Sequence, residues 1–544
     1  MSVHEPVPVA VDGGTPLPWR EEAWPRLTIP AALERAIALH GEQSVAWSYP
    51  DAGVELTLGG ARAAAAEWAD ALVAAGVLPG DVVAVALGSD PLWPVVQLAI
   101  AEAGAVMAGI NTRYRSHELA QVLRNCRPRL LISEADTERS PFASLAAEAL
   151  GQLDTPAIHV IADDDAAAER DAVGTAPAGT VLAADLLARG RAARAVGGIP
   201  SRPSVAPSDL ALIQYTSGST AAPKGVELTH DALLATAFQV VSAAGYTAED
   251  VIYSALPFYH VGGSICTGPG AYVSGARMVI PRRYDALGSV RQMIAAGCTA
   301  QQGHAAMFTM QIDAARAAGL LGELRLRKGW AAAPPTVIER IASEMGVEGI
   351  VPVYGMSEFG LVAAGSLQEP VAQRASGIGW PAPGAQIRLA GEGEIEVRGR
   401  QLLRGYRGDP NATAAAFTPD GWLRTGDLAR RGADGRLVFA GRVKDMIKPG
   451  GENVSAAEVE EFLRGHPLIA EVAVIGVPDE RLGEVPAAVV QPVPGADLKL
   501  ADVETFCHGR IASFKTPKHL LVEEQLPLLP NGKLDKRTLK ERYA

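Results

Sequence analysis

Residues 215–225 read YTSGSTAAPKG, and this stretch carries the strongest indication of fold and function in the chain. Its hydroxyl side chains and closely approaching backbone N–H groups are typical of a loop that donates hydrogen bonds to phosphate oxygens, and Lys224 adds a positive charge. The spacing excludes a Walker phosphate loop, in which two glycines bracket four residues before Lys and Ser or Thr. The alternative for this stretch alone is a surface turn, because Ser and Gly are common turn residues.

The sequence on either side of this loop predicts regular structure. Leu210–Gln214 is a short apolar run that indicates a buried strand. Thr229 is suited to cap a helix over His230–Val241. Both flanks are therefore compatible with a loop held at the edge of a sheet.

Four further motifs follow toward the C-terminus. Residues 353–358 (VYGMSE) combine an aromatic ring that can stack on a base with a carboxylate that can bind Mg²⁺. Residues 421–427 (GWLRTGD) place a carboxylate on a tight Gly turn, which suits both hydroxyls of a ribose. The next motif has two parts, GRVKDMIK at residues 441–448 and GGENV at residues 450–454, and the last is PNGKL at residues 530–534. Each alone is equally a glycine-containing turn or a solvated charge, and Asn-Gly is a common hairpin turn.

In this order, the five motifs resemble those of the adenylate-forming superfamily, which includes acyl-CoA synthetases, luciferases and peptide-synthetase adenylation domains. The resemblance covers nearly the whole chain, except the first two dozen residues and roughly 163–205. It implies an α/β fold with a large N-terminal domain at residues 1–441, built from two α/β sheet layers and a β-rich subdomain. It also implies a small, mobile α+β C-terminal lid domain at residues 445–544, with a hinge near 442–445.

The resemblance implies a nucleotide site drawn from several motifs. The β- and γ-phosphates of ATP are expected at Thr216, Ser217, Gly218, Ser219, Thr220 and Lys224. The adenine is expected at Ala332, Ala333, Pro334, Tyr354, Gly355, Met356 and Ser357. Asp427 and Arg442 are expected to bind the ribose, while Glu358 and Thr220 are expected to hold Mg²⁺. Ala221 stands where the family usually has glycine, which restricts the backbone of the loop.

The same resemblance implies a reaction in two halves. A carboxylic acid attacks the α-phosphorus of ATP to give an acyl-adenylate, and Lys533, Thr220, Glu358 and His260 are the expected catalytic residues. The lid then swings about Lys444, which removes Lys533 and brings Gly450, Gly451 and Glu452 to the site. Glycines there leave room for a pantetheine arm. Without the family, Lys533 is a surface lysine and Gly450-Gly451 is a flexible turn.

The acyl pocket is expected around residues 256–264, 302–307 and 360–361. Its predicted lining is His260, Val261, Gly262, Gly263, Gln302, Gly303, His304 and Gly360. His260 either gates the thiol and orients the carboxylate or is simply a packed, hydrogen-bonded histidine. Residues 256–273 contain no acidic side chain, so the α-amine of an amino acid would find no charged partner there.

Together with this neutral pocket wall, the resemblance implies an ATP-dependent ligase that joins a fatty acid of medium or long chain to CoA. The alternatives are an aryl or alicyclic acid as substrate, and the phosphopantetheine of an acyl carrier protein as acceptor. A non-catalytic nucleotide-binding homologue and an oxygen-using, luciferase-like oxidase are more distant alternatives. The expected cofactors and partners are ATP, Mg²⁺, CoA and a small carboxylic acid.

Composition excludes other classes of protein. The net charge of −12 and the pI near 5.4 argue against broad nucleic-acid binding, which needs a basic face. The four cysteines show no metal-binding spacing, and the apolar stretch Val82–Ile110 is interrupted by charges and prolines, which predicts no membrane span. These features predict a soluble cytoplasmic protein.

Short apolar runs that alternate with amphipathic stretches predict layered α/β structure. We expect strands at Val82–Val85, Leu130–Ile132, Ala157–Ile161 and Met278–Pro281, β-rich structure at Glu394–Val397 and Leu437–Phe439, a helix at Glu118–Asn125 capped by Ser116, and a variable surface excursion at residues 163–205. The C-terminal module is expected to contain helices at Ala456–Arg464 and near Asp502–Ile511, with a strand at Glu471–Ile475.

Overall fold

The structure is a computed structural model, and it describes residues 24–136, 141–154, 156–162, 177, 179–216, 223–447, 449, 454–479, 482–508, 510–511, 513–529 and 533–543. The chain forms two compact units. Unit 1 comprises Met1–Gln386 and Arg398–Gly421, and unit 2 comprises Ile387–Val397 and Trp422–Ala544. The segment just before the predicted boundary at 441–445 therefore groups with the C-terminal segment, since its strand β21 (Leu437–Arg442) contacts helix α14 (Ala456–Leu463). The hinge near 442–445 stays a prediction.

An eight-stranded sheet carries the strand that leads into the phosphate loop. Its order is β19-β9-β8-β4-β3-β5-β6-β7, parallel from β8 to β7, with β9 and β19 antiparallel at one edge. The strands are β3 (Val82–Ala86), β4 (Val106–Gly109), β5 (Leu130–Ser133), β6 (Ile158–Ile161), β7 (Val181–Leu182), β8 (Leu210–Thr216), β9 (Lys224–Thr229) and β19 (Gly405–Tyr406). Four of these confirm predicted strands.

A nine-stranded sheet forms the second α/β layer of unit 1, in the order β16-β15-β14-β13-β12-β10-β11-β1-β2. Strands β14, β13, β12, β10, β11 and β1 are parallel, with antiparallel strands at both edges. The strands are β1 (Val45–Tyr49), β2 (Val54–Thr57), β10 (Val251–Ser254), β11 (Arg277–Val279), β12 (Ala300–His304), β13 (Lys328–Ala332), β14 (Gly349–Met356), β15 (Gly360–Ala364) and β16 (Trp380–Pro381).

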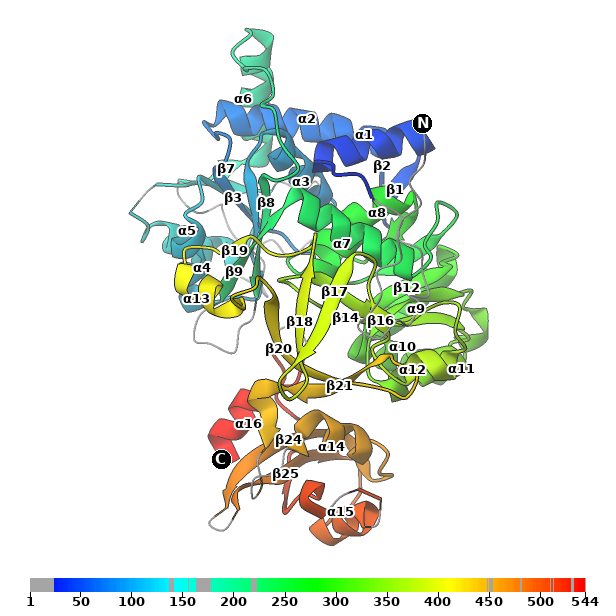
Figure 1. The fold of residues 1–544 in the computed structure, drawn as a ribbon. Coiled ribbons are helices and arrows are strands. Elements are labelled where there is room, and N and C mark those ends of the chain that lie inside the picture. The colour runs from blue at the N-terminus through cyan, green and yellow to red at the C-terminus, as the bar shows by residue number, and fades with distance from the viewer. Residues whose placement is uncertain are drawn as a thin grey trace. The chain divides into compact units, whose positions relative to one another are not determined.

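Helix α7 (His230–Ala243) joins the two sheets. It contacts β8 and β9 of one sheet and β15 of the other, and nearly all of its residues are buried (Figure 1). The Thr229 hydroxyl accepts a hydrogen bond from the Ala232 N–H at 3.1 Å, which confirms the predicted cap. The other helices of unit 1 are α1 (Ile29–His40), α2 (Leu58–Ala74), α3 (Leu92–Glu102), α4 (Ser116–Cys126), α5 (Phe142–Leu150), α6 (Ala183–Ala195), α8 (Gly268–Ser274), α9 (Ala286–Ala295), α10 (Ala305–Ala318), α11 (Pro335–Glu344), α12 (Val371–Ala375) and α13 (Pro410–Ala416).

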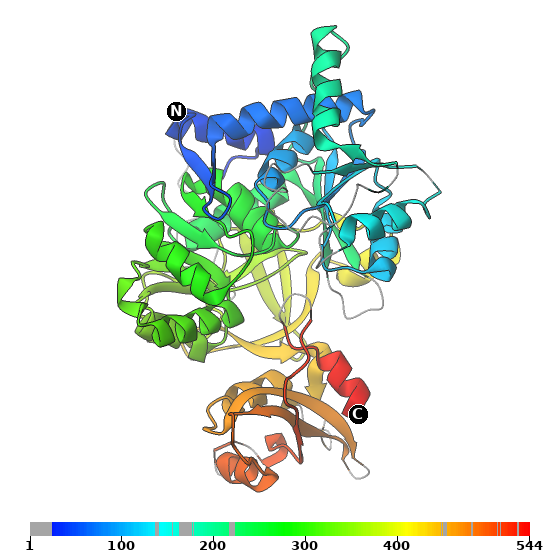
Figure 2. The ribbon, with the colours of Figure 1, turned by 180° about the vertical axis from the view of Figure 1, so that it is seen from behind.

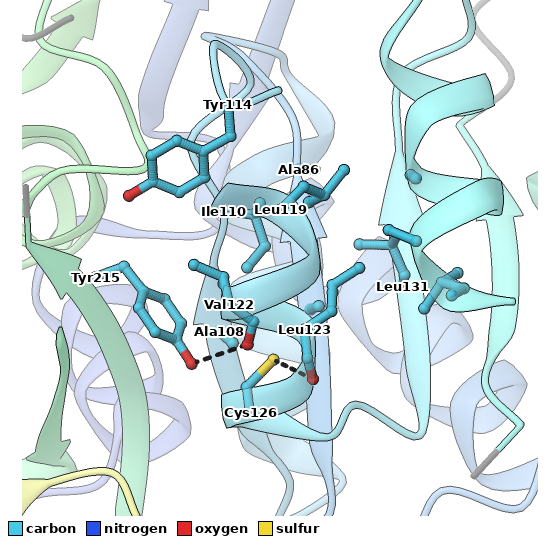
Figure 3. Close-up of a cluster of buried hydrophobic side chains, with 14 of the residues drawn as sticks. Ala86, Ala108, Ile110, Tyr114, Leu119, Val122, Leu123, Cys126, Leu131 and Tyr215 are labelled. Atoms are coloured by element: carbon cyan, nitrogen blue, oxygen red, sulfur yellow. Dashed lines mark hydrogen bonds between the residues drawn. The ribbon is translucent and has the colours of Figure 1, made fainter. Parts of the chain in front are cut away.

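Helix α4 packs beside the root of the phosphate loop. The Tyr215 hydroxyl donates to the Val122 carbonyl at 3.4 Å and to Asn125 Oδ1 at 2.8 Å, within a buried apolar cluster (Figure 3). The helix confirms the prediction for Glu118–Asn125, but the predicted cap was wrong. Ser116 is the first helical residue, and the Glu118 carboxylate accepts from the Arg115 N–H at 3.1 Å instead, because an acidic side chain in the first turn can satisfy an unpaired backbone donor.

Within the predicted surface excursion at residues 163–205, the described part contains one strand and one helix, β7 and α6. Strand β7 extends the eight-stranded sheet, and α6 packs on α2. A Cβ at Gly190 would lie 2.7 Å from the Ala71 backbone, so the glycine allows the two helices to approach closely. This alanine- and glycine-rich sequence thus forms a tight helix–helix contact within the predicted excursion, which the sequence pattern did not specify.

Unit 2 is smaller and contains two β-structures. Most of a four-stranded sheet, ordered β17-β18-β20-β21, belongs to it, and β24 and β25 form a long antiparallel pair extended by β26 (Figure 2). The elements are β17 (Ala385–Ala390), β18 (Glu394–Gly399), β20 (Leu423–Arg431), β21, β22 (Met446–Ile447), β23 (Val454–Ser455), α14, β24 (Ile469–Asp479), β25 (Gly483–Pro492), α15 (Leu500–Cys507), β26 (His519–Val522) and α16 (Lys536–Tyr543). The helices and strands predicted in this region are confirmed to within a few residues. Among the described residues, no helix is both long and apolar enough to cross a membrane.

Candidate active site

In unit 1, the carboxyl ends of the parallel strands of the nine-stranded sheet lie together at one end of the sheet. Strands β12, β13 and β14 end there at His304, Ala332 and Met356. Ala332 and Gly355 are exposed, and Ala333, Pro334, Tyr354, Met356 and Ser357 are half-buried. In open α/β sheets, ligands bind outside the carboxyl ends of the strands. The residues predicted to hold adenine are thus gathered at an accessible edge.

The phosphate-loop motif connects two antiparallel strands. Thr216, the last residue of β8, pairs with Lys224, the first residue of β9, and both are half-buried. The predicted phosphate ligands Ser217, Gly218, Ser219 and Thr220 lie outside the described residues, as does Ala221. The described residues show where the loop begins and ends, because Thr216 and Lys224 lie opposite each other at one end of the β8–β9 hairpin.

Tyr406 connects the predicted phosphate-binding lysine with the predicted metal-binding carboxylate. Its hydroxyl donates to Glu358 Oε1 at 3.0 Å, and the Lys224 Nζ lies 5.0 Å from the centroid of its ring. Burial, followed by the negative charge of Glu358, raises the pKa of the phenol, so the hydroxyl stays protonated as a donor. Sequence reasoning missed Tyr406 because it lies outside the five motifs.

The donor set fits a magnesium ion that arrives on a nucleotide. Mg²⁺ is commonly held by one or two carboxylates together with substrate phosphates and water. Glu358 provides such a carboxylate, half-buried and oriented by Tyr406. No group of three or more His, Cys, Asp or Glu residues suited to a metal ion occurs in the described part of the chain. The described residues therefore match a site in which protein and nucleotide together bind Mg²⁺, and not one in which protein side chains alone surround the ion.

The turn that carries His260 is tied to the phosphate-loop strand. Gln214, on β8, donates to the Tyr259 carbonyl, and its Oε1 accepts from the Ser264 hydroxyl at 2.9 Å. The turn continues as a π-helical segment, Gly262–Thr267, a rare form that often occurs at functional sites. A Cβ at Gly263 would lie 2.3 Å from the Pro257 carbonyl oxygen, so only glycine fits there. Gln214 is a polar residue at the end of an apolar run, and this pattern could have indicated that its side chain bonds to the turn that carries His260.

Two residues predicted to line the acyl pocket are buried in the structure. Gln302 is fully buried; its amide donates to Ser254 and Thr267 and accepts from the Trp330 indole at 3.0 Å. Gly360 is buried with φ +72°, and a Cβ there would lie 2.2 Å from Thr236 Oγ1, so its space is already filled by α7. Neighbouring groups therefore fill the space around both residues, and their assignment to the pocket lining stays a prediction.

The other residues predicted to line the acyl pocket differ in how much exposed surface they keep. Those that keep exposed surface are His260, Val261, Gly262 and His304, whereas Gly263 and Gly303 are buried. His260 packs edge-to-face on Tyr259, with ring centroids 4.9 Å apart. A short accessible stretch, His260–Gly262, thus remains where the π-helical segment begins.

In unit 2, the predicted ribose-binding pair forms one contact between neighbouring strands. Asp427 on β20 lies directly opposite Arg442 at the end of β21, and Arg442 Nε is 2.8 Å from Asp427 Oδ1. The Asp427 side chain is 4% exposed and that of Arg442 is 48% exposed, so the carboxylate is fixed and the guanidinium is accessible. Asp427 lies within a strand and not on the predicted tight turn, although Gly426 before it has φ +70°.

Lys533 belongs to the same electrostatic group. Its backbone carbonyl accepts from the Leu529 N–H at 2.7 Å, which closes a hairpin whose residues 530–532 lie outside the described range. The residue is solvent-exposed overall, but desolvation around the amine and the charge of Arg442 lower the pKa of Lys533, and Asp427 opposes this shift. Gly450, Gly451 and Glu452 lie outside the described residues, and Lys444 lies within the short helical turn Val443–Asp445.

Two family models match most of the chain. The model of a family described as "AMP-binding enzyme" matches residues 33–407, and the model of the AMP-binding enzyme C-terminal domain matches residues 458–533. The chain belongs to the AMP-binding enzyme family. In this family, the chain is an enzyme of the acid–thiol ligase class, as the relatives that it resembles are named CoA ligases and acyl-CoA synthetases.

Two relatives and one solved structure illustrate the likeness of this AMP-binding enzyme. It is 33% identical over 519 residues to the 3-[(3aS,4S,7aS)-7a-methyl-1,5-dioxo-octahydro-1H-inden-4-yl]propanoyl:CoA ligase of Rhodococcus jostii (strain RHA1), which covers 94% of this chain and 98% of that protein. It is 28% identical over 508 residues to the mitochondrial medium-chain acyl-CoA ligase of Danio rerio, over 87% of this chain and 81% of that protein. The crystal structure of ATP-bound MatB from Rhodopseudomonas palustris superposes with a TM-score of 0.80 at 26% identity, over 95% of this chain and 99% of that one.

Proposed function

We propose that this enzyme activates an apolar carboxylic acid with ATP and transfers the acyl group to CoA. The observation that carries the proposal is the Lys224–Tyr406–Glu358 cluster, which brings a cation for phosphates and a carboxylate for a metal to the start of the phosphate-loop hairpin. The Asp427–Arg442–Lys533 cluster of unit 2 supports it with groups suited to a ribose and a reacting carboxylate.

In the first half-reaction, an oxygen of the acid attacks the α-phosphorus of ATP. A bond forms between that oxygen and phosphorus, the bond to the bridging oxygen of the β-phosphate breaks, and pyrophosphate leaves with the electron pair. Negative charge accumulates on the phosphoryl oxygens, so fixed positive charges give the main acceleration. Lys224 and residues 216–220 hold the β- and γ-phosphates, and Lys533 bridges the acid and the α-phosphate.

The remaining residues hold the nucleotide in place. Mg²⁺, when bound on ATP, neutralises charge on the phosphate oxygens, and Glu358 with Thr220 would hold it. Asp427 accepts hydrogen bonds from the ribose hydroxyls while Arg442 limits the repulsion between this carboxylate and the phosphates. Tyr354 stacks on the adenine beside Ala332, Ala333 and Pro334. Positioning of this kind lowers the barrier because the reacting atoms are held in line.

In the second half-reaction, the CoA sulfur, after loss of its proton, attacks the carbonyl carbon of the acyl-adenylate. A thioester bond forms, the bond to the AMP oxygen breaks, and AMP leaves. His260 lies in the accessible part of its turn and is the residue proposed to orient the acid and admit the thiol. Residues 450–452 are proposed to border the pantetheine arm after rotation about Lys444.

The acid is proposed to be apolar and uncharged beyond its carboxylate. No acidic side chain occurs in residues 256–273 to pair with an amine, and Val261, Gly262 and Gly263 are small and neutral. A medium- or long-chain fatty acid is the first candidate. An alicyclic or aryl acid is the second, and it is favoured by the relative at 33% identity, which is named for a propanoyl group on a reduced indane ring.

The test is pyrophosphate release from Mg·ATP over a panel of acids, with CoA, holo acyl carrier protein or neither as acceptor. The panel contains decanoate, 3-cyclohexylpropanoate, indoleacetate and, as a charged control, alanine. We expect release with an apolar acid only, and an acyl-CoA of the expected mass. Turnover of 3-cyclohexylpropanoate but not decanoate would select the second candidate.

Other outcomes would overturn parts of the proposal. An acyl group found on the carrier protein and not on CoA would replace the proposed acceptor. Release with alanine would contradict the argument from the uncharged pocket wall. Absence of pyrophosphate release, combined with measurable ATP binding, would favour a non-catalytic nucleotide-binding role.

A further inference from the structure

Tyr406 occupies a position between two groups that come from distant parts of the sequence. Lys224 begins β9, whereas Glu358 lies in the connection between β14 and β15. The phenol touches both, through its hydroxyl at 3.0 Å to Glu358 Oε1 and through its ring at 5.0 Å from the Lys224 Nζ. One side chain therefore contacts both an ammonium and a carboxylate.

The strand that carries Tyr406 is itself held firmly. Tyr406 pairs with Val226 of β9, and its N–H donates to Thr413 Oγ1 at 2.9 Å. The next residue, Arg407, donates its N–H to the Gly225 carbonyl at 2.7 Å, and its carbonyl accepts from Asn125 Nδ2 at 2.8 Å. These contacts come from β9, α13 and α4, so the ring position is fixed by three elements.

The same segment also holds the backbone at Glu358. The Leu403 N–H donates to the Glu358 carbonyl at 2.8 Å, three residues before Tyr406. Backbone and carboxylate of Glu358 are thus both anchored to residues 403–406. A hydroxyl that served packing alone would be satisfied by any nearby acceptor, as the Tyr253 hydroxyl is by the Ser289 hydroxyl at 2.7 Å in the core of unit 1.

We propose that Tyr406 is a positioning residue that fixes the Glu358 carboxylate relative to the Lys224 ammonium, so that both engage one Mg·ATP at the same time. This inference rests on the proposed function. The hydroxyl acts on the metal through Glu358, and the ring acts on the phosphates through Lys224. The two effects are separable, because phenylalanine at position 406 keeps the ring without the hydroxyl, whereas leucine has neither group.

The experiment measures the dissociation constant of ATP by calorimetry, with Mg²⁺ and with EDTA, for the full chain and its variants. For Tyr406→Phe we expect the advantage of Mg·ATP over metal-free ATP to fall by roughly tenfold, because a hydrogen bond to a charged group is lost. Binding of metal-free ATP should stay within about twofold. For Tyr406→Leu we expect a further loss of roughly threefold that affects both forms of ATP, as the cation–π contact disappears.

Two controls separate positioning from general loss of structure. Tyr253→Phe removes a comparable hydroxyl contact elsewhere in unit 1 and should leave the ratio of the two affinities unchanged. In a Glu358→Gln background, Tyr406→Phe should have little additional effect on this ratio, since residues that act through one another are not additive.

The results that would overturn the inference are distinct from those that would overturn the proposed function. If the wild-type protein binds ATP equally with Mg²⁺ and with EDTA, the metal role of Glu358 fails and the inference fails with it. If the wild-type protein prefers Mg·ATP and Tyr406→Phe keeps that preference, only the inference is wrong. Equal weakening of both forms of ATP by Tyr406→Phe, or full additivity with Glu358→Gln, would reduce Tyr406 to a structural residue.

Discussion

The two clusters of predicted site residues are held in place by different physical means. In unit 1, Glu358 and Lys224 are joined by the hydroxyl and ring of Tyr406, which is fixed by hydrogen bonds from three elements. In unit 2, Asp427 and Arg442 form an ion pair across adjacent strands, and Lys533 interacts with them through charge from an exposed position. Hydrogen bonds and a ring contact hold the first cluster together, whereas interactions between full charges hold the second.

This difference predicts how each cluster responds to change. The Glu358 carboxylate is held by a hydrogen bond from an un-ionised phenol, a short-range contact that ends when the partner is removed. Charges near the surface act over distance, and their interaction changes with protonation and with neighbouring charges. Variants of unit 2 should therefore alter rates and pH profiles, whereas the Tyr406 variants should alter metal-dependent affinity.

The largest expected effect comes from Lys533→Ala. Removal of a charge that stabilises the transition state typically costs on the order of 10²–10³-fold in rate, so acid-dependent exchange of pyrophosphate into ATP should fall by about that factor. Thioester formation from chemically prepared acyl-adenylate and CoA should change only a few-fold, since Lys533 is proposed to act in the first half-reaction alone. Both rates are measured on the same preparation.

Lys499→Ala is the matched control for this variant. Lys499 lies in unit 2 and forms an exposed ion pair with Asp497, with a distance of 3.2 Å and both side chains more than two-thirds exposed. Exposed pairs contribute little, so both half-reactions should be unchanged. Equal losses in the two half-reactions for Lys533→Ala would contradict the assignment of this lysine to adenylation.

The second cluster was more predictable from sequence than the first. Asp427, Arg442 and Lys533 all lie within the quoted motifs, and Asp427 and Arg442 face each other in neighbouring strands. Tyr406 could not be found in this way, since its role depends on β9, α4 and α13 meeting around it. Only tertiary contacts distinguish it from the other tyrosines of the chain.

The same reasoning explains what the sequence did not reveal at the predicted acyl pocket and in the fold. The positions of Gln302 and Gly360 suggested pocket lining, but three polar partners surround the Gln302 amide and α7 fills the space at Gly360. Strand and helix patterns were predicted correctly where apolar periodicity was strong. Residues 181–195 were missed because close packing of α6 on α2 uses small residues, which also occur in loops.

A smaller effect is expected from Asp427→Asn. The neutral amide retains the shape of the side chain but loses charge-assisted hydrogen bonds to the ribose, which should raise the KM for ATP by roughly tenfold. Discrimination between ATP and 2′-deoxy-ATP should shrink at the same time. The measurement is the ratio of kcat/KM for the two nucleotides in wild type and variant.

The ratio also separates binding from folding. Asp427 is nearly buried and paired with Arg442, so its substitution will also affect the stability of unit 2. Loss of folded protein lowers the rates with both nucleotides equally and leaves their ratio unchanged. An unchanged ratio in folded Asp427→Asn protein would show that this carboxylate does not bind the ribose.

The smallest expected effect is a shift in the pH profile of adenylation. Lys533 must be protonated to act as a cation, and desolvation together with Arg442 lowers its pKa from the ordinary value of about 10.4. The ammonium therefore loses its proton at a lower pH than a free lysine, and the adenylation rate at saturating ATP should fall as the pH rises toward 10.

Arg442→Gln removes a neighbouring positive charge, which raises the pKa of Lys533 and should move this falling limb to higher pH. Asp427→Asn removes a negative charge and should move the limb in the opposite direction. Since packing contributes nothing to these two opposite shifts, a limb that stays fixed in both variants would mean that the charges of unit 2 do not govern Lys533.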